Sequence, residues 1–150
     1  MDIHAALKNR TVAVAESCTG GMLSSILTAR SGASAYFLLG VVVYSNKMKN
    51  KILGIPVSVI ERRGAVSKEV AAAMAASVRK LSNTDFGIGI TGVAGPLGGS
   101  KDKPVGTVYI AAASNRANIC RRFNFKGSRA GIRKQSCLAA LAMLKKLLDK

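Results

Sequence analysis

The chain has 150 residues, of which 49% are hydrophobic, so it suits one folded domain and is not an intrinsically disordered chain. Its 23 Lys and Arg residues outnumber 7 Asp and Glu residues, and the net charge of +16 predicts non-specific nucleic-acid binding at low salt. One histidine and scattered acidic residues argue against a His-dependent triad, a carboxylate pair and a carboxylate metal site, which leaves lysine, tyrosine or cysteine as a base.

The first predicted elements are a buried strand at residues 11–15 and a helix at residues 19–29, joined through the sequence ESCTGG. A strand-to-helix turn exposes its side chains at the carboxyl edge of a sheet, where α/β proteins bind ligands. We expect the free N–H groups at the start of this helix to hold an oxyanion or a phosphate. From this stretch alone, Ser17 is a helix cap, a phosphate ligand or a nucleophile.

A second strand, at residues 38–44, leads into a helix at residues 46–53 through the sequence YSNKMKNKILG. We expect its polar side chains at the same edge as Ser17. A lysine acts as a base only when it is neutral, and burial away from carboxylates lowers its pKa. A chain this poor in acids can therefore supply a lysine base, whereas for Lys47 and Lys51 we prefer a solvated surface position.

Helices at residues 57–63 and 67–81, the latter capped by Ser67, precede a strand at residues 85–90. That strand leads into the glycine-rich loop TGVAGPLGG at residues 91–99, whose N–H groups are free to bind an anion. The loop is neither a Walker A motif nor a Rossmann fingerprint, because no G-K-[ST] follows it and the next element is a strand. Taken alone, the loop is a weak indication of ligand binding.

The last predicted elements are two strands at residues 105–113 and 118–125, paired as a hairpin, and a helix from Ser128 to about residue 148. Arg129 lies in the first turn of this helix, where its charge opposes the helix dipole unless an anion is bound. It is either a phosphate or carboxylate ligand or an exposed arginine of a basic region. The alternation of elements predicts a single α/β domain, a three-layer α/β/α sandwich with a mixed sheet.

The cellular location is predicted from the lack of targeting signals. No apolar run reaches the roughly 18 residues of a membrane helix, and the first ten residues lack the apolar core of a signal peptide. The cysteines Cys18, Cys120 and Cys137 show no zinc spacing and are expected to be free thiols in a reducing compartment. We therefore expect a cytoplasmic protein without membrane contact.

Taken together and in this order, the motifs resemble the CinA C-terminal domain family. The matching strings are AESCTGG, YSNKMKNKILG, GAVS at residues 64–67, ITGVAGP and KPVGTVYIA, and the match runs from about residue 7 to the end. The enzymatic members of this family are nicotinamide-nucleotide amidohydrolases, also called NMN deamidases. The chain is similar to their stand-alone form, without the molybdopterin-binding-like N-terminal domain of the longer CinA proteins.

The resemblance implies hydrolysis of nicotinamide mononucleotide (NMN) to nicotinate mononucleotide and ammonia by a Ser–Lys centre, with no cofactor and no metal. By motif position, Ser17 would be the nucleophile, Lys49 the base, and Tyr44 a residue that assists proton transfer or orients Lys49. Arg129 would face the phosphate, and residues 19–21 would contact the oxyanion. The implied substrate-binding residues are Cys18, Thr19, Gly20, Gly21, Asn46, Thr91, Gly92, Gly95 and Arg129. A homodimer or larger assembly is implied as well.

Three positions depart from the family pattern. Leu97 stands in a loop that is usually GPGGG-like, and Ser128 replaces the common Asp of a GDR motif. Lys47 adds a cation beside the proposed base. The first two departures bear on the shape of the pocket, and the third bears on the pKa of Lys49.

Two other functions stay open. One is a non-catalytic module that binds a nucleotide, or binds DNA or RNA in competence or damage responses. The other is an amidase for a different carboxamide, which would not need Arg129. The intact set of Ser17, Tyr44 and Lys49 favours the enzyme, whereas salt-sensitive nucleic-acid binding without ammonia release would favour the binding module.

Overall fold

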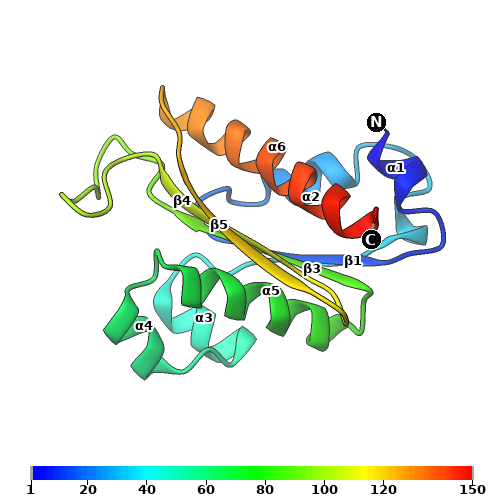
Figure 1. Ribbon diagram of the computed structural model, residues 1–150, viewed down its shortest axis with the longest axis horizontal. Helices are drawn as coiled ribbons and strands as arrows, with labels where there is room; N and C mark the ends of the chain where they lie inside the picture. The colour runs from blue at the N-terminus through cyan, green and yellow to red at the C-terminus, as the bar shows by residue number, and fades with distance from the viewer. Residues whose placement is uncertain (1, 150) are drawn as a thin grey trace.

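The computed structural model describes residues 2–149, which fold around a five-stranded mixed sheet (Figure 1). Its strands lie in the order β2-β1-β3-β4-β5. Their bounds are β1 (Val12–Glu16), β2 (Phe37–Val42), β3 (Phe86–Gly92), β4 (Thr107–Ala113) and β5 (Asn118–Asn124). β1 runs parallel to β2 and β3, whereas β4 is antiparallel to both β3 and β5. The predicted mixed sheet and its antiparallel hairpin are therefore confirmed.

Helices cover both faces of this sheet and make the three predicted layers (Figure 1). One face carries α1 (Ile3–Ala6), α2 (Met22–Leu27) and α6 (Arg129–Leu148). The other face carries α3 (Asn46–Leu53), α4 (Val57–Arg63) and α5 (Lys68–Ser82). A short 3₁₀ helix, η1 (Ala33–Ala35), precedes β2. Among residues 2–149, no helix combines the length and hydropathy that crossing a bilayer requires.

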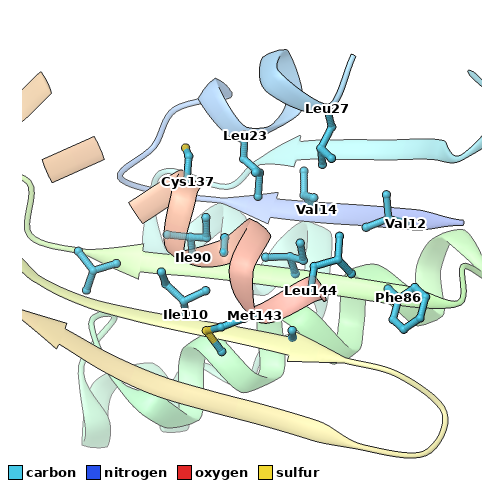
Figure 2. Packing of buried hydrophobic residues seen from close by; sticks show 14 of the residues in the cluster. Val12, Val14, Leu23, Leu27, Phe86, Ile90, Ile110, Cys137, Met143 and Leu144 are labelled. Carbon is cyan, nitrogen blue, oxygen red and sulfur yellow. The ribbon is translucent and has the colours of Figure 1, made fainter. Parts of the chain in front are cut away.

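The core on the α6 side follows the period-two pattern of the central strands (Figure 2). Val12 and Val14 of β1 face the cluster that contains Leu23 and Leu144, while the alternate residues of β1 face the opposite core beneath α5. Because both faces of the sheet are covered, every residue of β1 is buried. Glu16, the polar residue at the end of β1, is therefore stable there only if hydrogen-bond donors satisfy its carboxylate.

The layer on the α5 side is held close to the sheet by small residues. A Cβ atom on Gly87 or Gly89 of β3 would collide with the carbonyl oxygens of Ala75 and Ala71 in α5. The two glycines therefore let the backbone of an alanine-rich helix approach the strand directly. This close packing fixes α5 against β3.

Four chain connections meet at one edge of the sheet, on the left in Figure 1. The carboxyl ends of β1, β2 and β3 lie there because the three strands are parallel. Two reversals of direction bring the end of β5, and hence the start of α6, to the same edge. This edge is where open α/β sheets place their ligands.

Candidate active site

Ser17 follows β1 directly and is held at the sheet edge by its backbone. Its N–H donates to the carbonyl of Ile90 in β3 at 3.0 Å, and only 8% of the residue is exposed. The N-cap of α2 is Gly21, which has no side-chain cap, so Ser17 is not the helix cap. The hydroxyl of Ser17 instead lies 3.1 Å from the Nζ atom of Lys49.

Lys49 is a buried lysine on α3, with 1% of its surface exposed. Besides Ser17 Oγ, its Nζ atom contacts the carbonyl oxygens of Val43 at 3.0 Å and Tyr44 at 3.1 Å. Within residues 2–149 it forms no ion pair with a carboxylate. Burial therefore lowers the pKa of Lys49 below its usual value of 10.5.

These three contacts suit a neutral amine that accepts a proton. A neutral lysine has two N–H hydrogens and one lone pair, whereas its ammonium form has three donors and no acceptor. The ammonium form donates to all three oxygen atoms, whereas in the neutral form the two carbonyls take the two hydrogens and the lone pair faces the hydroxyl of Ser17. A neutral Lys49 is therefore placed to accept a proton from Ser17.

A cavity of about 300 Å³ opens beside this pair at the sheet edge. It brings together residues from five separate parts of the chain, including most of the predicted site: Ser17, Cys18, Tyr44, Asn46, Lys49, Thr91, Gly92, Gly95 and Arg129. Residues 19–21 do not line it and lie in the turn that follows Ser17. Lys47 is exposed and is not part of the cavity wall.

Tyr44 and Arg129 form one wall of the cavity. The guanidinium of Arg129 donates to the carbonyl of Gly95 at 2.7 Å and to the Tyr44 hydroxyl at 3.2 Å. Tyr44 orients Lys49 through its backbone carbonyl, while its hydroxyl is engaged by Arg129. Arg129 remains exposed, so its charge is accessible to an anion in the cavity.

The start of the glycine-rich loop forms another part of the cavity wall. The Thr91 hydroxyl donates to the carbonyl of Ala65 at 2.8 Å, which ties β3 to the connection before α5. A Cβ atom on Gly92 would stand 2.7 Å from a methyl carbon of Val108, and one on Gly95 would collide with Val105. The loop therefore needs glycine at both positions to keep its path around the cavity.

Glu16 corrects the prediction that the start of α2 is free to bind an oxyanion or a phosphate. The helix begins at Met22 rather than at residue 19, and the fully buried Glu16 carboxylate caps it. One carboxylate oxygen accepts from the N–H groups of Gly21 at 3.2 Å and Leu23 at 3.0 Å. The other accepts from the N–H and the hydroxyl of Ser24, each at 2.8 Å. These donors are therefore unavailable to a substrate.

Backbone N–H groups without an acceptor are found instead just before these capped groups, in the turn after Ser17. Within residues 2–149, the N–H groups of Cys18 and Thr19 have no acceptor in another residue. The hydroxyl of Thr19 is buried and likewise lacks a partner in the described part of the chain. Of these two residues, Cys18 lines the cavity and Thr19 does not, so the N–H of Cys18 is a donor available beside Ser17.

Arg133, like Glu16, contacts the turn after Ser17 in a way that was not predicted from the sequence. It lies one turn after Arg129 on α6 and donates to the carbonyls of Cys18 at 3.1 Å and Thr19 at 2.8 Å. Gly20 has a left-handed φ of 58°, and a Cβ atom there would stand 3.2 Å from the Arg133 guanidinium. Arg133 therefore fixes the turn that follows Ser17.

The remaining candidate groups are excluded or explained by their surroundings. Burial raises the pKa of Cys18 to about 11, so this thiol stays protonated near neutral pH and is a poor nucleophile. Ser128 accepts from the N–H of Gly131 and caps α6, the role that an Asp also fills. Leu97 stands at the cavity rim with 85% of its surface exposed.

Several known proteins are similar to this chain in sequence and in fold. A "CinA-like protein" from Koribacter versatilis is 49% identical over 142 residues, which are 95% of this chain and 34% of the relative. The chain thus spans about a third of the length of the curated relatives it matches. Crystal structures of CinA superfamily proteins from Klebsiella pneumoniae and Escherichia coli match with TM-scores of 0.93 and 0.90. They are 31% and 34% identical, and the matches cover 98% and 96% of this chain and 93% and 84% of theirs. Because the family model for the CinA C-terminal domain also matches residues 2–148, the chain belongs to this family.

Proposed function

We propose that the protein is a nicotinamide-nucleotide amidohydrolase, which converts NMN and water to nicotinate mononucleotide and ammonia. The observation that carries the proposal is the 3.1 Å contact between Ser17 Oγ and a buried Lys49. A serine paired with an unprotonated amine is an activated nucleophile. Membership of the CinA C-terminal domain family supports the choice of an NMN carboxamide as substrate.

Acylation begins when neutral Lys49 takes the hydroxyl proton of Ser17 and the oxygen attacks the carboxamide carbon. That carbon is electrophilic because the pyridine nitrogen of NMN is quaternary. The oxyanion of the tetrahedral intermediate receives a hydrogen bond from the N–H group of Cys18. Such a donor is worth about 3–4 kcal/mol of transition-state stabilisation. The carbon–nitrogen bond then breaks, and the Lys49 ammonium gives its proton to the leaving ammonia.

Deacylation follows the same path in reverse. Water replaces ammonia beside Lys49, which takes a proton as the water oxygen attacks the ester carbon. The ester bond to Ser17 breaks, and Lys49 returns the proton to the serine oxygen. The products are nicotinate mononucleotide and the regenerated pair of Ser17 and neutral Lys49.

The cavity supports recognition of a phosphorylated substrate. Arg129 presents an exposed guanidinium at one wall, and a guanidinium binds a phosphate with paired hydrogen bonds. Asn46 and the loop glycines Gly92 and Gly95 line the rest of the cavity and are assigned to the ribose and the pyridine ring. Tyr44 joins the phosphate side to the catalytic side through its bonds to Arg129 and Lys49.

The proposal is tested by ammonia release from NMN with the purified protein and its Ser17→Ala variant. We expect release by the wild type and a loss of at least about 10³-fold in kcat on removing the nucleophile. Ser25→Ala is the matched control, because Ser25 is an exposed serine on α2, and it should retain wild-type activity. A folded wild-type protein that releases no ammonia, or a Ser17→Ala variant with full activity, would contradict the proposal.

A further inference from the structure

We infer that Arg133 is a positioning residue, which holds the turn after Ser17 and so aims the oxyanion-binding N–H group of Cys18. The inference rests on the proposed function, because it concerns the attack of Ser17 on a carbonyl carbon. Arg133 is half-buried and comes from α6, 115 residues away from Cys18 in sequence. Its guanidinium reaches the carbonyls of two consecutive peptide units in the turn after the nucleophile.

The first of these bonds sets the direction of the Thr19 N–H group. The peptide between Cys18 and Thr19 is trans, so its C=O and N–H groups point in opposite directions. Because Arg133 holds the carbonyl of Cys18, the peptide that follows Cys18 is fixed, with the N–H of Thr19 directed away from the guanidinium. That N–H has no acceptor among residues 2–149.

The second bond sets the direction of the Cys18 N–H group through one further peptide. Arg133 and the N–H of Met22 hold the carbonyl of Thr19, and the N–H on the opposite side of that peptide, from Gly20, donates to the Ser17 carbonyl at 3.1 Å. That bond in turn fixes the peptide between Ser17 and Cys18. The N–H of Cys18, on the opposite side of this peptide from the Ser17 carbonyl, is thereby fixed as well.

Other groups support the turn only in part. The Glu16 carboxylate takes the N–H groups of Gly21, Leu23 and Ser24, which lie after the turn. Gly20 adopts a left-handed conformation, so its own backbone does not restrict the turn as a larger residue would. The Thr19 carbonyl also accepts from the N–H of Met22, but within residues 2–149 the Cys18 carbonyl has no donor besides Arg133, so the orientation of the peptide between Cys18 and Thr19 depends on Arg133.

The test measures acylation of Ser17 directly, with 4-nitrophenyl nicotinate as the probe. Ser17 Oγ attacks the ester carbon, its proton passes to Lys49, and the carbon–oxygen bond to 4-nitrophenolate breaks and releases a coloured product. The rate that remains in Ser17→Ala is subtracted. We expect Arg133→Met to lower the Ser17-dependent rate by about 10- to 100-fold, the effect of a misplaced oxyanion donor.

Arg79→Met is the matched control. Arg79 is also half-buried and donates to one backbone carbonyl, that of Asp85, at the other end of the sheet. The Arg79→Met variant should be acylated at Ser17 at a rate within about twofold of the wild-type rate. With NMN, Arg133→Met should lower kcat and leave KM nearly unchanged, because the oxyanion forms only after substrate binding. A loss that is purely structural would change both parameters or the thermal unfolding of the protein.

The outcomes separate this inference from the proposed function. Wild-type acylation rates in a folded Arg133→Met variant would overturn the inference, even if NMN is hydrolysed. Ser17-dependent acylation that requires Arg133, with no hydrolysis of NMN, would support the inference and contradict the proposed function. A wild type that is not acylated at Ser17 would overturn both. If Arg133→Met does not fold, Arg133→Leu decides, because leucine donates to neither carbonyl and full activity of the folded variant would contradict the inference.

Discussion

Lys49 is the residue on which the proposed chemistry depends. Its amine is buried beside Ser17, and two backbone carbonyls satisfy it without the carboxylate partner that would keep it charged. Lys47 does not contribute, because it is exposed and lies two positions away on α3, where side chains point in different directions. Burial alone therefore explains the lowered pKa of Lys49.

The pH dependence of the reaction follows from this lowered pKa. The rate of ammonia release should rise with pH as Lys49 loses its proton, and the rise should lie below the usual lysine value of 10.5. Lys49→Arg should abolish ammonia release at every pH, because arginine stays protonated in proteins and cannot accept the proton of Ser17. Lys51→Arg, at an exposed position on the same helix, should keep the wild-type profile. Measuring kcat from about pH 6 to about pH 10 checks this, and a flat wild-type profile would argue against Lys49 as the base.

At the residue scale, site residues that follow strands could be predicted from the sequence, whereas residues whose side chains hydrogen-bond to backbone groups could not. The positions of Ser17 and Lys49 at the ligand-binding edge were predictable because each comes after a strand that ends there, whereas the role of Lys49 rests on the family resemblance. Arg133 was not predictable, because its partners are carbonyl groups more than 100 residues away, and backbone groups carry no residue-type signal. Glu16 had one overlooked signal, a lone carboxylate between an apolar strand and a helix.

At the element scale, cap residues decided which helix bounds could be predicted. The predicted bounds of α3 and α4 match the structure, since Ser45 caps α3 and glycines follow the last residue of both helices. The start of α2 was placed three residues too early, because Glu16 caps it from the preceding strand. The four-residue α1 was not predicted, because so short a segment shows no helical periodicity.

The cap of α2 makes a prediction for stability. Glu16→Gln replaces one acceptor oxygen with an amide N–H₂ group that faces the N–H donors of the helix. We expect a loss of about 2–3 kcal/mol in the free energy of unfolding, measured by urea denaturation. Glu69→Gln, which alters an exposed acid in the first turn of α5, should stay within about 0.5 kcal/mol. Equal stability of the two variants would show that Glu16 is not the principal cap.

At the scale of the whole molecule, the parallel strands explain how the site assembles. Ser17, Lys49, Gly92 and Arg129 come from four distant segments, and only the sheet order brings their connections to one edge. The alternation of strands and helices in the sequence was enough to predict this convergence, because it indicated an α/β fold with parallel strands. It could not supply the distances, which depend on how α3 and α6 pack against the sheet.

The net charge of +16 makes a second prediction at this scale. We expect duplex DNA to bind weakly and without sequence preference, since only the phosphates would be contacted. In fluorescence anisotropy, two duplexes of unrelated sequence should bind equally, and raising salt from about 50 mM to about 200 mM should lower the affinity at least about tenfold. A marked preference for one duplex at the higher salt would instead favour a dedicated nucleic-acid-binding role.

The most direct test of the central claim is to trap the covalent intermediate on Ser17. The protein is mixed with NMN, quenched with acid within one turnover, and analysed by peptide mass spectrometry. The account predicts a nicotinate mononucleotide ester on the peptide that contains Ser17, and no such ester in Ser17→Ala. Release of ammonia during the first turnover by a protein whose Ser17 peptide never carries the ester would contradict a serine nucleophile activated by Lys49.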